Sequence, residues 1–197
     1  AMDTRLIRLP RARAEHRRNL LRASSVSAAC LSVEPCQCDP VARRNAVVTV
    51  GYLTLPCSPA DLRALSEIFV DAVDSGAAVS FLSPLSIDRA ENWWRTTLAS
   101  PHPRAAFLIA RDESGVLGTV QLQPAWAPNQ PHRAELCKLM VHRRARGKGV
   151  ARTLMGAAEN AARERGFSLL TLDAKRGGVA CALYEKLGWS MVGIIPG

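Results

Sequence analysis

The segment Arg146–Ala151, RGKGVA in one-letter code, constrains the fold of this chain more than any other. It lies between an apolar segment, Leu136–Val141, and a helical pattern, Val150–Arg165. A glycine-rich turn between a strand and a helix leaves backbone N–H groups free, and the helix N-terminus adds a partial positive charge. Small residues let a phosphate approach the backbone closely. The segment therefore predicts an anion site, although a plain strand-to-helix turn with solvated basic residues also fits.

The surroundings of this motif exclude two common nucleotide sites. It lacks the Lys-Ser/Thr ending of a nucleotide P-loop, which argues against Mg-nucleotide chemistry. It also lies in the middle of the domain, whereas a dinucleotide-binding fingerprint usually opens the first βαβ unit. A second segment, Ala182–Trp189 (ALYEKLGW), predicts a short helix followed by a strand.

Together these segments resemble the GCN5-related N-acetyltransferase (GNAT) family, which transfers acetyl from acetyl-CoA to an amine. The pyrophosphate loop of that family reads Arg/Gln-x-x-Gly-x-Gly/Ala, matched here by Arg146, Gly149 and Ala151. The LYEKLGW letters resemble its second motif, with Tyr184 at the position of the usual general acid. The stretch RAELCKLMVHRRARGKGVARTLM further resembles the tabtoxin-resistance type of small-molecule acetyltransferase. The resemblance covers 47–197.

The resemblance implies an α/β fold of the GNAT type. In that fold a mixed, mostly antiparallel sheet is flanked by helices, and a splayed pair of parallel strands surrounds acetyl-CoA. The domain boundary is expected at residue 47, with residues 1–46 as a basic extension. The family usually continues with one more strand beyond the position of Ile195, and that final strand is missing here.

Periodicity and capping residues predict the same order of elements, β-α-α-β-β-β-α-β-α-β. Ser58-Pro59 predicts a helix start and Gly76 its end, and Asp112–Gly115 predicts a hairpin turn. The predicted strands are Val47–Leu55, Phe107–Arg111, Val116–Gln123, Ala134–His142, Ser168–Asp173 and Trp189–Ile195, and the later helices are Ile87–Leu98, Val150–Arg165 and Val179–Leu187.

The cofactor implied by the resemblance is acetyl-CoA, a co-substrate, and no metal is expected. Its pantetheine arm would pair with the backbone edge of Leu139, Met140 and Val141, which are also ordinary core strand residues. Its phosphates would lie on the turn and the first helical residues: Arg146, Gly147, Lys148, Gly149, Val150, Ala151 and Arg152. Basic side chains at Arg143 and Arg144, and more weakly Lys175 and Arg176, could screen the phosphates or form a solvated face.

Three side chains are candidates for catalysis. Tyr184 could donate a proton to the departing sulfur, or simply pack its helix. Glu135 and Asp173 could each accept the amine proton, directly or through water, because an acid desolvated in a cleft can have a raised pKa. Glu135 could instead be a solvent-facing strand residue. His132 and His142 flank the same region and are weaker candidates.

Net charge supports no nucleic-acid partner for the catalytic domain. The chain carries a formal charge of +9, but residues 1–46 hold nine arginines and four acids, which leaves +4 for the rest. An anionic cofactor explains that excess. Residues 1–46 are compatible with a basic helix, a targeting segment, a disordered extension or a tag remnant.

The six cysteines do not form a zinc-ligand pattern. Cys36 and Cys38 lack a second pair at the required spacing, and Cys137 and Cys181 lie in apolar patterns. Free thiols indicate a reducing, cytoplasmic location. No apolar run is long enough to span a membrane.

The leading hypothesis is an N-acetyltransferase that acts on a primary amine of a small molecule, such as an antibiotic or a toxin. Its acceptor pocket is expected from the GAAVSFL loop (76–82), the Trp93-Trp94 helix and the Pro124–Pro131 loop with Trp126. Protein or peptide acetylation, and a non-catalytic CoA-binding module, remain alternatives. Because the last strand of the family is absent, an apolar sheet edge is expected to be covered by residues 1–46 or by a second subunit, which predicts a homodimer.

Overall fold

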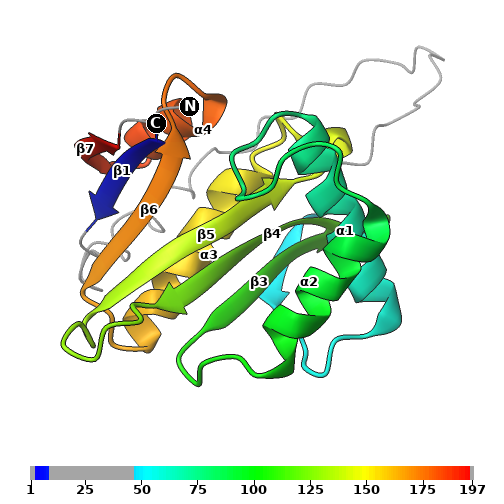
Figure 1. Cartoon of the computed structure of the whole chain (residues 1–197), viewed down its shortest axis with the longest axis horizontal. Coiled ribbons are helices and arrows are strands. Elements are labelled where there is room, and N and C mark those ends of the chain that lie inside the picture. Colours follow the sequence, from blue (N-terminus) through cyan, green and yellow to red (C-terminus); the bar gives the residue numbers. More distant parts are fainter. Residues whose placement is uncertain (1–2, 9–46, 196–197) are drawn as a thin grey trace, which may run out of the picture. The chain divides into compact units, whose positions relative to one another are not determined.

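The structure is a computed structural model that describes residues 3–8 and 47–195. Its centre is a seven-stranded sheet with the strand order β2-β3-β4-β5-β6-β1-β7 (Figure 1). The strands are β1 (Asp3–Arg8), β2 (Thr49–Tyr52), β3 (Ala106–Asp112), β4 (Gly115–Pro124), β5 (Arg133–Val141), β6 (Leu169–Lys175) and β7 (Ser190–Ile195). Only the β5–β6 pair is parallel among these strands, and the other neighbours are antiparallel.

The helices begin at the capping residues that the sequence provides. In α1 (Pro59–Asp74) the Ser58 hydroxyl accepts the Asp61 N–H at 3.1 Å, and Pro59 fills the first helical position. In α2 (Ile87–Ala99) Ser86 caps the Arg89 N–H in the same way, at 3.3 Å. The remaining elements are α3 (Val150–Glu164), α4 (Val179–Lys186) and a 3₁₀ turn, η2 (Arg143–Ala145).

The two faces of the sheet bury separate apolar clusters. One cluster joins β3–β6 to α3 through residues such as Leu122 and Leu154, both fully buried. The other joins the opposite face to α1 and α2, with Phe69 and Trp94 at its centre. Helices packed on both faces hold β3, β4 and β5 in place. These strands therefore form a firm platform for the residues that follow β5.

The parallel pair is short, and the sheet opens beyond it. β5 pairs with β6 only where Arg133–Glu135 lie beside Leu169–Thr171. Beyond this point the two strands diverge, as Figure 1 shows, and β6 continues along β1 on its other side. The later part of β5 therefore has no strand partner on its β6 side among the described strands. This opening is the splayed pair that the fold class predicts.

All ten predicted elements are confirmed, with ends that differ by at most a few residues. The sequence analysis missed β1, which lies between β6 and β7 and pairs with both. Residues 3–8 therefore belong to the sheet, and the domain boundary expected at residue 47 is wrong for them. β1 pairs with residues far away in the sequence, and such pairing leaves no local signal. The prediction of a basic extension for residues 9–46 lies outside the described residues.

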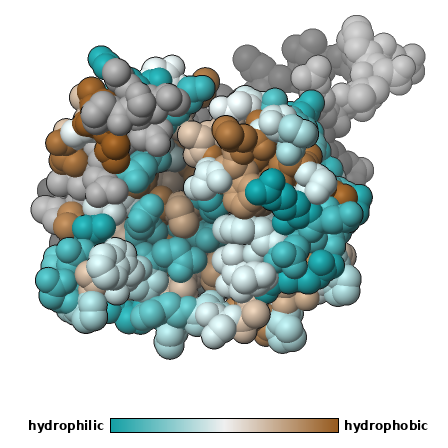
Figure 2. Space-filling model, in the orientation of Figure 1, coloured by the Kyte–Doolittle hydropathy of each residue, from teal (hydrophilic) through white to brown (hydrophobic). Residues whose placement is uncertain are grey.

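β7 is the last strand of the sheet, and its outer side is apolar. All six of its residues are exposed, and Met191, Val192, Ile194 and Ile195 are large hydrophobic residues among them. Figure 2 shows this hydrophobic surface over β7. Within the described helices, none has both the length and the apolar character that a membrane span requires.

Candidate active site

The turn between β5 and α3 presents backbone N–H groups to open space. Gly147 and Gly149 have φ values of +75° and +81°, which glycine adopts without strain. A Cβ atom built on either residue would meet no atom within 4 Å, so the surface above both is open. Gly149 caps α3 without a side-chain hydrogen bond. The first N–H groups of α3 thus have no capping side chain and can donate to an anion.

A buried carboxylate from α1 holds the residues before this turn. Asp71 is 6% exposed and accepts the backbone N–H of Arg143 at 2.9 Å. The same oxygen accepts a hydrogen bond from Arg146 at 2.9 Å, and the other oxygen accepts one from the Arg143 guanidinium. Burial raises the pKa of Asp71. The hydrogen bonds from Arg143 and the charges of both arginines lower it by a larger amount, so the pKa lies below its ordinary value.

The sequence analysis missed Asp71. Its one signal is an acid at a position that the helical period of α1 turns inward, among Ile68, Phe69 and Ala72. An acid on a buried helix face requires a partner. Its partners here are 72 and 75 residues away in the sequence. The sequence could have shown that Asp71 needs a partner, but it could not have shown which residues are its partners.

The side chain of Arg146 is bonded within the protein. It donates to the Val141 carbonyl at 2.9 Å, to the Ser75 hydroxyl at 3.0 Å and to Asp71. Its guanidinium therefore fastens the turn to α1, because the buried Asp71 carboxylate attracts it. The Val141 carbonyl, which belongs to one of the three residues expected to pair with the pantetheine arm, accepts one of these bonds.

The other basic residues divide into two groups. Arg143 is bound to Asp71, and Arg144 donates to the Val116 carbonyl at 2.9 Å. Lys148 and Arg152 are exposed beside the open surface of the turn. These two remain the basic side chains placed to meet a phosphate there.

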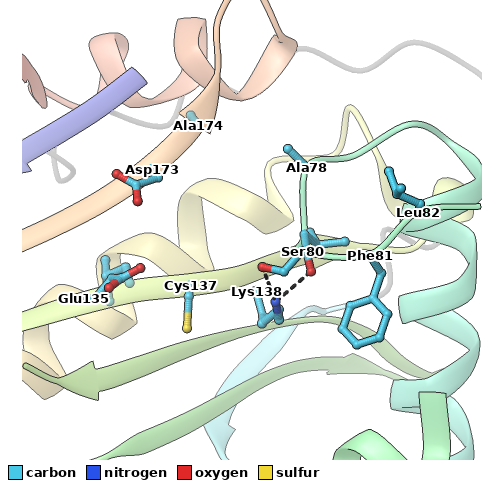
Figure 3. Close-up of a pocket in the computed structure, with 11 residues that line it drawn as sticks. Ala78, Ser80, Phe81, Leu82, Glu135, Cys137, Lys138, Asp173 and Ala174 are labelled. Carbon is cyan, nitrogen blue, oxygen red and sulfur yellow. Dashed lines mark hydrogen bonds between the residues drawn. The ribbon is translucent and has the colours of Figure 1, made fainter. Parts of the chain in front are cut away.

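Beside the opening between β5 and β6 lies a cavity of about 360 Å³. It is lined by Ala78–Leu82 of the loop after α1, by Glu135–Lys138 of β5, and by Asp173 and Ala174 of β6. Figure 3 shows the Glu135 and Asp173 side chains on neighbouring strands at one end, and Lys138 beside Ser80 at the other. The structure thus brings the two predicted carboxylates into one cavity.

Burial keeps a cysteine thiol and a tyrosine phenol protonated at neutral pH. Burial raises the pKa of the Cys137 thiol, which lines the cavity, to about 12, so it is not a thiolate nucleophile. Burial also raises the pKa of Tyr184, on α4, to about 12. The Tyr184 side chain is 7% exposed and packs against Trp189, with ring centroids 6.1 Å apart. Tyr184 does not line the cavity.

The two candidate histidines and the tryptophans of the expected acceptor pocket lie outside the cavity. His142 accepts the Arg144 N–H at 3.2 Å and so caps η2, and the His132 carbonyl accepts the N–H groups of residues 168 and 169. Neither histidine lines the cavity. The expected pocket from the Trp93-Trp94 helix and the Pro124–Pro131 loop is wrong for this cavity, because Trp94 is fully buried in the core and Trp126 is 92% exposed.

The comparisons with known proteins agree with this geometry. Residues 65–189 match the acetyltransferase (GNAT) family, and the chain belongs to that family. It is an N-acetyltransferase by this match and by its relatives, and the family uses acetyl-CoA. In the described residues there is no group of three or more His, Cys, Asp or Glu side chains that could hold a metal ion.

Three similar proteins illustrate the match. An uncharacterized N-acetyltransferase in the hisH-hisA intergenic region of Azospirillum brasilense is 33% identical over 58% of this chain and 68% of its own length. The L-methionine sulfoximine/L-methionine sulfone acetyltransferase of Pseudomonas aeruginosa is 28% identical over 70% and 79%. The structure of yncA from Salmonella typhimurium, solved with its cofactor acetyl-CoA, shares the fold, with 20% identity, coverage of 74% and 81%, and a TM-score of 0.60.

Proposed function

We propose that this protein transfers acetyl from acetyl-CoA to a primary amine of a small molecule that binds in the cavity between β5 and β6. The observation that carries the proposal is the position of Glu135 and Asp173. They lie on the two strands of the parallel pair, where the strands separate, and they line one cavity. This arrangement supports a role for both carboxylates as proton acceptors beside the opening that would admit a thioester.

The residues present fit acetyl-CoA. When bound, it supplies an activated acetyl group as a thioester. The side of β5 at Leu139 and Met140 that has no partner among the described strands offers backbone groups to the pantetheine amides, while the Val141 carbonyl already accepts one hydrogen bond from Arg146. The backbone N–H groups from Gly147 to Arg152 would hold the pyrophosphate. Lys148 and Arg152 would add positive charge to the site.

Glu135 and Asp173 would prepare the amine. An incoming ammonium must lose a proton before its nitrogen can attack a carbonyl carbon. A carboxylate oxygen of either residue can accept that proton, directly or through a bridging water, and the two negative charges attract the cation to this end of the cavity. Fixing the nitrogen beside the opening contributes orientation as well.

Tyr184 would complete the proton transfers. Its phenol O–H can be donated to the sulfur that leaves as acetyl transfer proceeds. Because its pKa is about 12, the phenol stays protonated across the pH range in which the amine is deprotonated. Its packing against Trp189 fixes the ring. Tyr184 would therefore act as the general acid.

The size of the cavity supports a small acceptor. A volume of about 360 Å³ lies at the small end of the range for ligand sites. The Pseudomonas aeruginosa relative is named for two small amino-acid derivatives, which supports the same class here. We infer that the acceptor is a small amine, such as an amine-bearing antibiotic or toxin.

We infer in addition that the protein forms a homodimer through β7. Its exposed apolar residues lie on a strand at the edge of the sheet that the described strands form, and such an edge offers backbone groups for pairing as well as apolar area. Analytical ultracentrifugation should show a dimer at micromolar concentration. A Met191→Lys substitution should convert it to a monomer, and a wild-type monomer would contradict the inference.

The experiment that tests the function measures thiol release from acetyl-CoA with a panel of small amines, polyamines and peptides. We expect turnover with at least one small amine, and loss of most turnover in the Glu135→Gln/Asp173→Asn double variant. An Asp88→Asn variant, changed at an exposed position of α2, is the matched control. Turnover with peptides alone would transfer the proposal to a peptide acetyltransferase. A thermal shift with acetyl-CoA but no turnover with any acceptor would contradict it.

A further inference from the structure

β5 contains an irregularity at the cavity. Gln121 of β4 is opposite Cys137, whereas Thr119 is opposite Met140. Two residues of β5, Lys138 and Leu139, therefore face one residue of β4, which is the count that defines a β-bulge. Lys138 has a φ of +53°, a left-handed conformation that a residue with a side chain adopts at a cost.

The bulge changes the face on which Lys138 lies. In a regular strand Lys138 would share the α3 side of the sheet with Leu136, which packs in the α3 cluster. Instead, its ammonium nitrogen lies 5.8, 5.9 and 5.2 Å from the ring centroids of Phe69, Phe81 and Trp93, which belong to the α1–α2 side. These distances suit cation–π attraction.

The same ammonium group binds the loop that forms one wall of the cavity. The Lys138 Nζ donates to the Val79 carbonyl at 2.7 Å and to the Ser80 hydroxyl at 3.1 Å (Figure 3). Ser80 has a φ of +68°. Ser80 and Lys138 are the two non-glycine residues with positive φ in the described part of the chain, and they contact each other. Within residues 3–8 and 47–195, backbone strain of this kind is thus concentrated at the wall of the cavity.

Burying an ammonium group at this position costs the folded protein free energy. Burial lowers the pKa of Lys138, while the neighbouring Cys137 and Glu135 act in the opposite direction. Arg89 lies over the same Phe81 ring, 5.4 Å from its centroid, and adds a second positive charge nearby. A methionine would fill the same space among three aromatic rings without desolvating a charge. The two hydrogen bonds to the loop are what a methionine could not supply.

We propose that Lys138 is a positioning residue that holds residues 79–81 in the shape of the acceptor wall and thereby sets the affinity for the amine. This role rests on the proposed function, because it takes the cavity as the acceptor site. Lys138 acts through the loop and takes no part in proton or acetyl transfer. Its loss should therefore change the KM for the amine much more than kcat or the affinity for acetyl-CoA.

The test compares Lys138→Met with the wild type and with Lys186→Met, which removes a lysine at an exposed position of α4. With the best acceptor from the panel, we expect the amine KM of Lys138→Met to rise about tenfold or more. Its kcat and its Kd for acetyl-CoA should stay within about threefold of the wild type, as should all constants of Lys186→Met. An unchanged amine KM, or an equal loss of acetyl-CoA affinity, would overturn the proposal.

A second measurement does not depend on turnover. Hydrogen exchange should show faster exchange of the backbone amides of residues 79–82 in Lys138→Met, with α1 and α2 unchanged. If Lys138→Met fails to fold, Ser80→Gly serves instead, because glycine accepts a φ of +68° freely while the hydroxyl contact is lost. Unchanged exchange in the loop of the folded variant would overturn the proposal. If no amine is acetylated by the wild type but the loop still loosens, the proposed function fails and the positioning of the loop stands.

Discussion

The helices α1–α3 and the segment from α4 to β7 differ sharply in how deeply they are buried. α1 and α3 each bury seven residues, and the Trp94 side chain of α2 is fully buried. In α4 only Tyr184 is buried, and every residue of β7 is exposed. The first region supplies a rigid support for the turn and for β5. The second carries the proposed acid, Tyr184, on a thinly packed element.

The largest expected effect tests this difference in packing. Trp94→Ala, in the packed region, should lower the free energy of unfolding by about 3–5 kcal/mol, because it empties a fully enclosed site. Met191→Ala in β7, where the side chain is 59% exposed, should change it by about 0.5 kcal/mol or less in the monomer. Urea unfolding of both variants at low protein concentration measures the contrast. Similar losses of unfolding free energy in the two variants would contradict the difference in packing between the two regions.

The next effect concerns chemistry in the thinly packed region. Tyr184→Phe should lower kcat about 100-fold, because the proton donor is lost while the ring still packs against Trp189. The Kd for acetyl-CoA and the midpoint of thermal unfolding should stay close to the wild type. Since the pKa of Tyr184 is about 12, kcat of the wild type should not fall between pH 7 and pH 10 through loss of this proton. Undiminished kcat in the variant would remove Tyr184 from the mechanism.

A smaller effect tests whether α1 holds the turn between β5 and α3, where the phosphates of the cofactor would bind. Asp71→Asn should raise the KM for acetyl-CoA about tenfold, because Arg143 and Arg146 lose a charged partner. Glu67→Gln, which alters an exposed pair with Arg63 on the same helix, is the matched control and should change the KM little. An equal KM in the two variants would show that the turn does not depend on α1.

The pH dependence of stability gives a second test of Asp71. Its pKa is lowered in the folded protein, so its stabilising contribution is present above the ordinary value of 3.8 and is lost as the pH falls through the lower folded value. The midpoint of thermal unfolding of the wild type should therefore approach that of Asp71→Asn as the pH is reduced from 6 to 3. A difference that stays constant over this range would assign the stabilisation to another group.

The smallest effect belongs to the exposed basic residues. Lys148→Gln together with Arg152→Gln should raise the KM for acetyl-CoA only a few-fold, because exposed charges interact weakly across water. The increase should be larger at about 20 mM salt than at about 300 mM salt, where the screening length is shorter. An increase that is independent of salt would indicate direct, buried contacts instead.

Local signals explain why the elements could be predicted from the sequence. Ser58-Pro59 and Ser86 cap their helices, and Gly147 and Gly149 adopt the left-handed conformations that a tight turn requires. Glu135 and Asp173 could be identified as a pair because each lies on a strand of the predicted parallel pair. The helix starts and the turn need only neighbouring residues, whereas the parallel pair that joins Glu135 and Asp173 is implied by the resemblance to the GNAT family.

Distant contacts explain what could not be predicted. The segment around Asp71 shows that this acid needs a partner but not which one, and the segment around Lys138 gives no signal; their partners are 72 and 59 residues away. The bulge that turns Lys138 toward the cavity has no glycine to mark it. β1 pairs with strands at the opposite end of the chain. Each of these features depends on where other parts of the chain lie in the folded protein.

Hydrogen exchange with and without acetyl-CoA tests the central claim most directly, which is that the opening between β5 and β6 holds the cofactor. Acetyl-CoA should slow exchange at the backbone amides of Leu139, Met140 and Gly147–Arg152. Exchange in β7 should not change. Binding of acetyl-CoA, detected by calorimetry, that leaves the amides of Leu139 and Met140 unprotected would contradict the claim.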